Sequence, residues 1–178
     1  MIIISNTTPL HYLIIIGEVE ILHQLFGQVI VPQAVMAELQ HQQTPAHVRN
    51  WISNRPAWLD VRSPSILDST LRLGAGESEA ISLAEELKAD QILLDDKKAR
   101  KAALARGLPV TGTLTLLEIA GERGLINLAE AIDRLRKTTF RAPAQAIEEI
   151  LRRDAERRKG QGAETTEHKS GLSNEADG

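Results

Sequence analysis

The chain opens with an apolar, β-branched run that ends abruptly in polar residues. Residues 2–4 are all isoleucine, and Ser5-Asn6-Thr7-Thr8-Pro9 follows them directly. Such a run is typical of a strand that is buried on both faces, as in the centre of a parallel sheet. In open α/β sheets the ligand site lies just beyond the carboxyl ends of the strands. The first place to look for chemistry is therefore the segment from Asn6 to Thr8.

Along the rest of the chain, short apolar runs alternate with segments whose apolar residues recur at helical spacing. The runs predict strands over residues 29–31, 59–62, 91–94 and 110–111. The helical spacing predicts helices over residues 9–16, 18–26, 32–40, 46–53, 77–88, 96–106, 113–122, 127–137 and 143–153, although residues 14–16 fit a strand equally well. Strands that alternate with helices indicate an α/β fold, a sandwich on a mostly parallel sheet.

The length of 178 residues suits one domain and a tail. We expect the domain to span residues 1–155 and residues 156–178 to be disordered, because the chain from Lys159 onward has almost nothing to bury. The apolar run Leu10–Ile16 is far shorter than the ~20 residues that cross a bilayer. No basic region precedes the first apolar run, so we expect no signal peptide, no membrane segment and a cytoplasmic location.

Composition narrows the chemistry further. The absence of cysteine excludes disulfides, cysteine-ligated zinc and thiol catalysis. The formal net charge of -3 means that nucleic-acid binding would need a local basic patch. Aromatic residues make up only 3% of the chain, which argues against a surface that stacks successive bases on rings.

Four acidic residues fall where this layout brings strand ends and helix starts together. Glu38 lies in the helix after the second strand, Glu77 opens a helix, and Asp95 and Asp96 follow the apolar residues 92–94. Clustered carboxylates without histidines at ligand spacing suit Mg²⁺ or Mn²⁺, ions that orient and activate water. Each acid also has an ordinary explanation, because first-turn acids favour the helix dipole and aspartates cap helices. A lone helix glutamate such as Glu38 is usually solvated.

Helical phase distinguishes Glu77 from its neighbours. Ala80, Ile81 and Ala84 lie within about 60° of it around the helix axis, which puts Glu77 on the core-facing side. Glu79 points about 160° away from Glu77 and is the weaker candidate. An acid on the inward face of a helix needs a partner, and a metal ion is one candidate.

Basic residues follow the two aspartates directly. Basic side chains beside an acidic pocket can hold a nucleic-acid backbone while the acids hold a metal. The alternative is that these residues form solvated helix faces. The first candidates for nucleic-acid binding are Lys97, Lys98, Arg100 and Lys101, and a second group comprises Arg134, Arg136, Lys137 and Arg141.

Five segments of the chain carry a resemblance when they are taken in order. They are Ile3–Leu10, Val31–Leu39, Gly74–Ile81, Leu93–Arg100 and Val110–Thr113. From residue 1 to about residue 155 the chain resembles PIN-domain proteins, in particular a prokaryotic PIN-like subfamily of uncharacterised function. The resemblance implies a PIN-like three-layer sandwich, in which helices flank a central, mostly parallel sheet. It also implies a Mg²⁺- or Mn²⁺-dependent endoribonuclease, often the VapC-type toxin of a toxin–antitoxin pair.

The same resemblance implies a site by position. The implied metal-binding and catalytic residues are Asn6, Glu38, Glu77 and Asp95 or Asp96, assisted by the hydroxyls of Thr7 and Thr113. The chain departs from the family at Asn6, where a nuclease of this family usually has Asp. Asn keeps a carbonyl oxygen that can bind a metal, but it lacks the negative charge and cannot accept a proton. We therefore expect weakened metal affinity and turnover.

Two functions stay open at this point. The first is a toxin-like, metal-dependent endoribonuclease with RNA as substrate and a cognate antitoxin protein as partner. The second is a catalytically weak or inactive PIN-like module that binds RNA or a protein partner, an interpretation that Asn6 favours. The apolar residues 114–119 and 10–16 would suit a homodimer surface, although burial in the monomer core explains them more simply.

Overall fold

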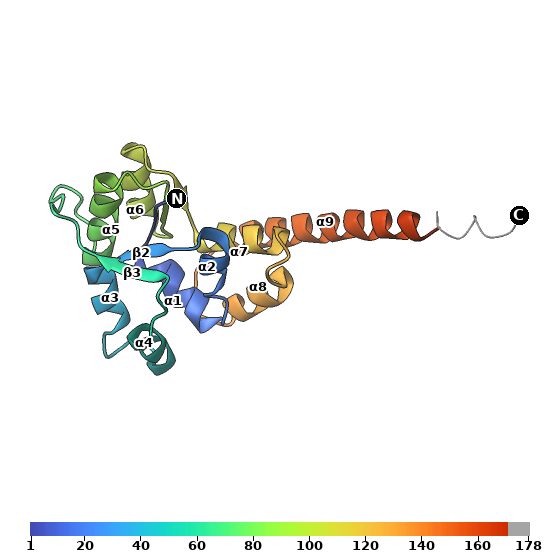
Figure 1. Cartoon of the computed structure of the whole chain (residues 1–178), viewed down its shortest axis with the longest axis horizontal. Helices are drawn as coiled ribbons and strands as arrows, with labels where there is room; N and C mark the ends of the chain where they lie inside the picture. The colour runs from blue at the N-terminus through green and yellow to red at the C-terminus, as the bar shows by residue number, and fades with distance from the viewer. Residues whose placement is uncertain (171–178) are drawn as a thin grey trace, which may run out of the picture.

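The protein is built on a five-stranded parallel sheet with the strand order β3-β2-β1-β4-β5. A computed structural model describes residues 1–170, with side chains described through residue 160 (Figure 1). The strands are β1 (Ile3–Ser5), β2 (Val29–Pro32), β3 (Leu59–Arg62), β4 (Gln91–Leu93) and β5 (Val110–Thr111). The predicted strands are therefore present, within a residue at their ends.

The first strand lies at the centre of the sheet, as its apolar run predicts. Ile4 pairs with Ile30 of β2 on one side and with Ile92 of β4 on the other. Ile3 and Ile4 are both fully buried, and they belong to hydrophobic clusters on opposite faces of the sheet. Alternation of side chains along a strand produces this division. Because the strands are parallel, their carboxyl ends share one edge, and Asn6 follows β1 at that edge.

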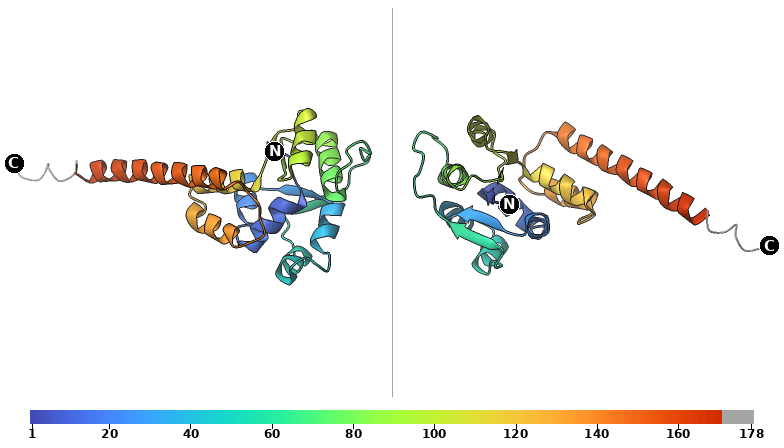
Figure 2. Two further views of the ribbon diagram at one scale, coloured as in Figure 1. Left: turned by 180° about the vertical axis from the view of Figure 1, so that it is seen from behind. Right: turned by 45° about the horizontal axis from the view of Figure 1, so that its top comes forward.

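Helices cover both faces of the sheet and complete a three-layer α/β sandwich (Figure 2). The helices are α1 (Thr7–Ile15), α2 (Ile21–Phe26), α3 (Gln33–Leu39), α4 (Ala46–Ser53), α5 (Ala75–Glu86), α6 (Lys97–Ala105), α7 (Thr113–Glu122), α8 (Leu128–Arg136) and α9 (Ala144–Ser170). The cluster around Ile4 takes its helical side chains from α5 and α6. The cluster around Ile3 takes them from the other helices, including α1, α7 and α8.

The first helix begins earlier than its proline suggests. Asn6 is the residue before α1 and has an extended backbone, so Thr7 and Thr8 occupy the first helical turn. Residues 14 and 15 are helical, and the strand alternative for this stretch is wrong. The positive φ of Gly17, 76°, suits the residue just past the end of a helix.

The apolar faces of α1 and α7 are used inside the monomer. Leu116 and Leu117 are fully buried in the same cluster as Leu10 and Leu13. The monomer core therefore accounts for most of the apolar side chains on these helices, and a homodimer stays a prediction. Among residues 1–170, no helix has both the length and the apolar character that crossing a bilayer requires.

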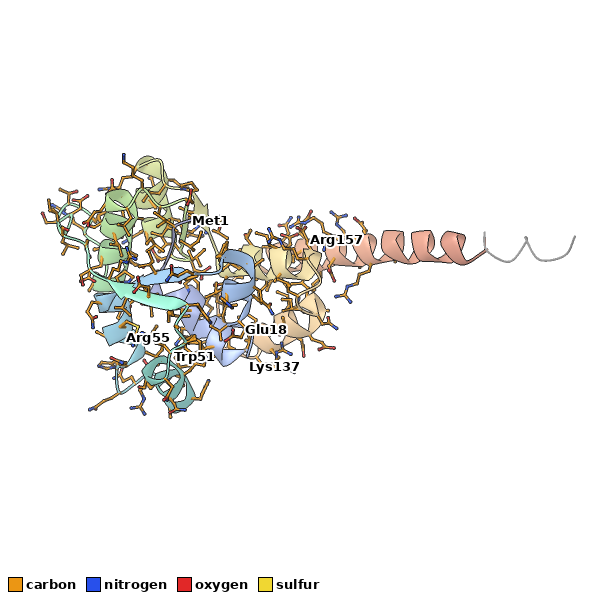
Figure 3. All side chains as sticks on the ribbon, viewed as in Figure 1. Met1, Glu18, Trp51, Arg55, Lys137 and Arg157 are labelled. Atoms are coloured by element: carbon orange, nitrogen blue, oxygen red, sulfur yellow. The ribbon has the colours of Figure 1, made fainter. Side chains whose placement is uncertain are left out.

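The last helix continues well past the predicted end of the domain. Arg153 forms an ion pair with Glu118 of α7. Arg157, which is labelled in Figure 3, forms an ion pair with Glu122 of the same helix. These two ion pairs join α9 to α7. The buried carboxylate of Asp154 binds Arg157 on the next turn. Helix α9 is described through residue 170, and ion pairs as far as Arg158 support its part that is poor in apolar residues. The domain end at residue 155 and the tail from residue 156 stay predictions. Residues 171–178 of the expected tail lie outside the described part of the chain.

Candidate active site

The predicted acidic residues lie around the carboxyl edge of the sheet. Glu77, near the start of α5, is close enough to Glu38 and Asp96 for their negative charges to influence it. Burial of Glu77 raises the pKa of its carboxyl group, and the charges of Asp96 and Glu38 raise it further. Within residues 1–170, no three acidic or histidine side chains converge closely enough to hold an ion between them. The carboxylates of Glu38, Glu77 and Asp96 therefore lie in the same region but do not converge on one point.

Asn6 presents an unsatisfied oxygen at this edge. The residue is only 3% exposed, and its Oδ1 is buried without a hydrogen-bond partner among the described residues. Its backbone N–H donates to the Leu93 carbonyl of β4, so the main chain is anchored while the side chain makes no capping bond. A buried polar atom without a partner costs about 1–3 kcal/mol. A cation is a natural partner for such a carbonyl oxygen.

Glu38 is held in place by residues from two other helices. Its carboxylate accepts hydrogen bonds from the hydroxyl of Thr7 and, at 3.0 Å, from the backbone N–H of Gly76. A Cβ atom on Gly76 would lie 2.8 Å from either carboxylate oxygen, which is too close for a carbon atom. Gly76 therefore allows α5 to approach Glu38, a role that the sequence analysis missed. The hydroxyl of Thr7 donates to Glu38 in this structure, and its role as a metal or water contact stays a prediction.

The acids near the start of α5 face in different directions. The carboxylate of Glu77 accepts a hydrogen bond from the backbone N–H of Gly74 at 3.2 Å, as expected at a helix start. Glu79 accepts one from the N–H of Ala34 at 2.9 Å, in the first turn of α3. Glu79 therefore stabilises the start of another helix, which agrees with its lower rank as a site residue.

The two adjacent aspartates are used differently. Both oxygens of Asp95 accept hydrogen bonds from Thr113, one from its N–H at 2.9 Å and the other from its hydroxyl at 2.6 Å. Asp96 caps α6 through one oxygen, which accepts from the N–H groups of Lys98 and Ala99. The other oxygen of Asp96, Oδ2, has no hydrogen bond to any described residue, and the carboxylate influences Glu77. The geometry favours Asp96 over Asp95 as a metal contact.

The hydroxyl of Thr113 is thus occupied by Asp95, which joins the end of β4 to the start of α7. Burial raises the pKa of Asp95, while the hydrogen bonds from Thr113 and the charge of Arg100 act in the opposite direction. Thr113 and Arg100 thus hold Asp95 in place at the end of β4.

The basic residues of α6 divide into two groups. Lys97, Lys98 and Lys101 are exposed, and they form no ion pair with a residue of the described chain. Arg100 is half-buried and turned inward, where its Nη1 donates to the Leu94 carbonyl at 2.9 Å beside Asp95. The lysines and Arg100 stay predicted contacts of a nucleic-acid backbone, and Arg100 also holds the end of β4 through the Leu94 carbonyl.

Most of the chain matches one family model. Residues 2–156 match a family model, DUF3368, described as a PIN domain. The structure is similar to that of a PilT N-terminus domain protein from the hyperthermophilic archaeon Sulfolobus solfataricus, with 16% sequence identity and a TM-score of 0.49. That similarity covers 80% of this chain and 100% of the archaeal chain. No curated protein matches the chain.

Proposed function

This chain belongs to the PIN-domain family, and we propose that it is a metal-dependent endoribonuclease that hydrolyses RNA phosphodiester bonds. The family is nuclease-like in general and generally uses divalent metal ions. The observation that carries the proposal is the orphaned oxygen of Asn6 just past the end of β1, taken together with the mutual influence of Glu38, Glu77 and Asp96. Oxygen atoms of this kind suit Mg²⁺ or Mn²⁺.

The residues that would hold the ion follow from these contacts. Asn6 would contribute its carbonyl oxygen, and Glu38, Glu77 and Asp96 would contribute carboxylates, one or two of them directly and the others through waters that the ion keeps, while Asp95 bonds to Thr113 beside them. A bound Mg²⁺ or Mn²⁺ supplies a water of lowered pKa and stabilises charge on the attacking and leaving oxygens.

The chain's own groups orient the substrate and the acids. Glu38 is kept in one position by Thr7 and Gly76, so it does not have to be ordered when the ion binds. Lys97, Lys98 and Lys101 would bind the phosphate backbone of RNA, since their ammonium groups are exposed near Asp96.

Calorimetric titration with Mn²⁺ tests the metal site. We expect Glu77→Gln to weaken Mn²⁺ binding by about tenfold, because glutamine keeps an oxygen but loses the charge. The matched control is Glu79→Gln on the same helix, which should bind like the wild type because Glu79 bonds to Ala34 instead. Equal affinities in all three proteins, or no binding by the wild type, would count against the proposed site. Cleavage of RNA in Mn²⁺, absent in EDTA, is the accompanying assay.

Glu77→Gln should also stabilise the metal-free protein at neutral pH. Burial, followed by the charges of Asp96 and Glu38, raises the pKa of Glu77, so the folded state holds this proton more tightly than the unfolded state. The stability of the wild type therefore falls as the pH rises from the ordinary value of 4.5 through the raised pKa. Glutamine cannot ionise, so the advantage of Glu77→Gln in Tm should grow between pH 4 and 7. A constant Tm difference over that range, measured in EDTA, would refute this explanation.

Asn6 favours a second candidate, a catalytically weak or inactive module that binds RNA or a protein partner. An Asn at this position removes one negative charge and cannot act as a base. RNA binding without cleavage, in a protein that does not bind Mn²⁺, would support this alternative.

We also propose a toxin role in the cytoplasm, with a cognate antitoxin protein as partner. A gene for a small antitoxin beside the gene for this chain would support that role. We also propose that two copies of this chain can form a homodimer.

A further inference from the structure

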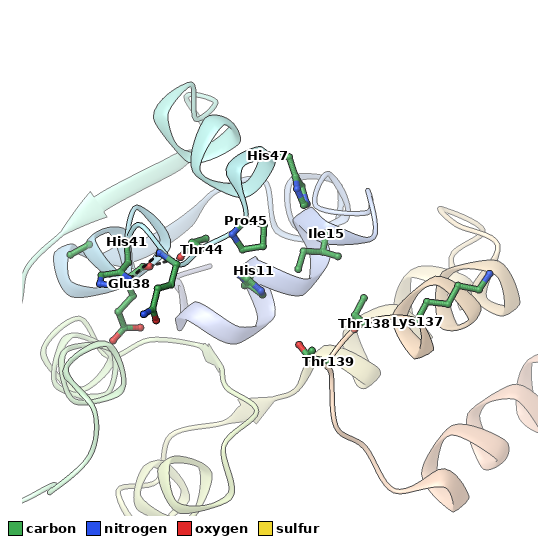
Figure 4. A pocket seen from close by; sticks show the side chains of 12 residues that line it. His11, Ile15, Glu38, His41, Thr44, Pro45, His47, Lys137, Thr138 and Thr139 are labelled. Carbon is green, nitrogen blue, oxygen red and sulfur yellow. Dashed lines mark hydrogen bonds between the residues drawn. The ribbon is translucent and has the colours of Figure 1, made fainter.

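A groove of ≈ 910 Å³ lies beside the acidic site, and Glu38 lines one end of it. Helix α1 contributes His11 and Ile15, the segment after α3 contributes His41 and Pro45, and α4 contributes His47 (Figure 4). The segment that follows α8 contributes Lys137, Thr138 and Thr139 across the opening. The volume lies in the upper part of the ~300–1,000 Å³ range of ligand pockets.

Glu38 connects the groove to the acidic site. It is exposed enough to line the groove, while its carboxylate accepts bonds from Thr7 and from Gly76 of α5. In Figure 4 the carboxylate points from α3 toward the neighbouring helix, away from His11 and Pro45. A polymer with one phosphate at the acids would therefore have a neighbouring part of its chain at the mouth of this groove.

The ionisable groups of the groove suit an anion. Glu38 is the one carboxylate that lines it, whereas three histidines and Lys137 offer nitrogen donors. Lys137 forms an ion pair with Asp133 at 2.8 Å, but both side chains are well exposed, at 72% and 63%. Such an exposed pair is worth ~0.2–1 kcal/mol at most, so an incoming phosphate can compete for the ammonium group.

The remaining groups suit the bases and sugars of an unpaired strand. Ile15 and Pro45 offer apolar surface, and the hydroxyls of Thr44, Thr138 and Thr139 can bond to base edges and 2′-hydroxyls. Burial lowers the pKa of His11, and nearby His47 lowers it further, so His11 acts as a neutral hydrogen-bonding group at pH 7. Base edges are accessible in this way only when the strand is not paired.

We propose that this groove binds the segment of single-stranded RNA next to the phosphodiester that is cleaved. The proposal deepens the ribonuclease assignment and rests on it, since the groove is placed relative to the acidic site. It assigns substrate contacts to the residues around His47 and Lys137, in addition to the lysines of α6.

Fluorescence anisotropy with a labelled pool of random single-stranded 12-nucleotide RNAs tests the proposal. The titrations are done in EDTA, so binding is measured without metal-dependent cleavage. We expect Lys137→Glu to raise the Kd by about tenfold, because a phosphate contact becomes a repulsion. We expect His47→Gln to raise it by about threefold through the altered hydrogen bonding. The matched control is Lys159→Glu, which makes the same charge change on an exposed residue of α9 and should stay within about twofold of the wild type.

A second measurement does not depend on the variants. The same RNA carrying 4-thiouridine should crosslink, on irradiation, to peptides that contain residues 41–47 and 137–139. Crosslinks confined to α6, or equal Kd values for Lys137→Glu and Lys159→Glu, would overturn the proposal. RNA that fails to bind the wild type at all would overturn it too and would leave a protein ligand as the better candidate for the groove.

The outcomes separate this proposal from the ribonuclease assignment. A protein that binds Mn²⁺ and cleaves RNA, but whose groove variants bind RNA normally, keeps its proposed function and loses the groove. A protein that does not bind Mn²⁺, but whose RNA affinity depends on Lys137 and His47, keeps the groove and loses the hydrolytic function.

Discussion

Replacement of Asn6 by Asp should tighten Mn²⁺ binding and speed RNA cleavage, each on the order of a hundredfold. The Oδ1 atom of Asn6 is buried and has no partner among the described residues, so a carboxylate at this position would place a full charge where the structure has a neutral oxygen. Without metal, the added charge would be buried and unpaired, and it should lower the Tm. Saturation with Mn²⁺ should then raise the Tm of Asn6→Asp more than that of the wild type.

The control for this experiment is Asn127→Asp. Asn127 caps α8 by accepting a hydrogen bond from the N–H of Glu130, and an aspartate can do the same. The control should therefore leave metal binding and cleavage unchanged. If Asn6→Asp also leaves both unchanged, the missing charge does not limit this protein, and the Asn oxygen is not at the metal site.

Replacement of Gly76 by Ala should separate function from stability. The new methyl group would meet the carboxylate of Glu38 at 2.8 Å, and the flexible end of that side chain is the part that can move. Glu38 would lose the hydrogen bond that it accepts from the Gly76 N–H. We expect Mn²⁺ affinity to fall by about 10–100-fold, which is typical when a contact that orients a metal ligand is removed. Alanine favours a helix by about 1 kcal/mol over glycine, so the free energy of unfolding should change little.

Gly160→Ala is the matched control, because Gly160 lies in α9 and a Cβ there would meet nothing within 4 Å. It should keep the metal affinity of the wild type. A Gly76→Ala protein that binds Mn²⁺ normally would show that the position of Glu38 does not matter for the ion. A protein that unfolds would show that α5 moves instead of Glu38; chemical denaturation, read by far-ultraviolet circular dichroism, distinguishes these results.

The features of this protein that depend on local pattern could be predicted from its amino-acid sequence. The isoleucines at residues 2–4 predicted a central strand, and Ile3 and Ile4 are indeed buried against opposite layers. The alternation of strands and helices predicted the parallel α/β sandwich, and the position of Asp95 and Asp96 before a helix predicted that one of them caps it, which Asp96 does. These features follow from the periods of strands and helices and from the unpaired N–H groups at a helix start, which are properties of neighbouring residues.

The contacts of each site residue depend on the tertiary structure and could not be predicted from local pattern. Glu38 and Gly76 are 38 positions apart, and Asp95 and Thr113 are 18 apart, yet each pair is joined by hydrogen bonds. The predicted layout put the acidic residues near one sheet edge, but it could not show that Thr113 bonds to both oxygens of Asp95 or that Asn6 keeps an oxygen unpaired among the described residues. Such details depend on how closely separate helices approach, which side-chain packing between distant segments sets.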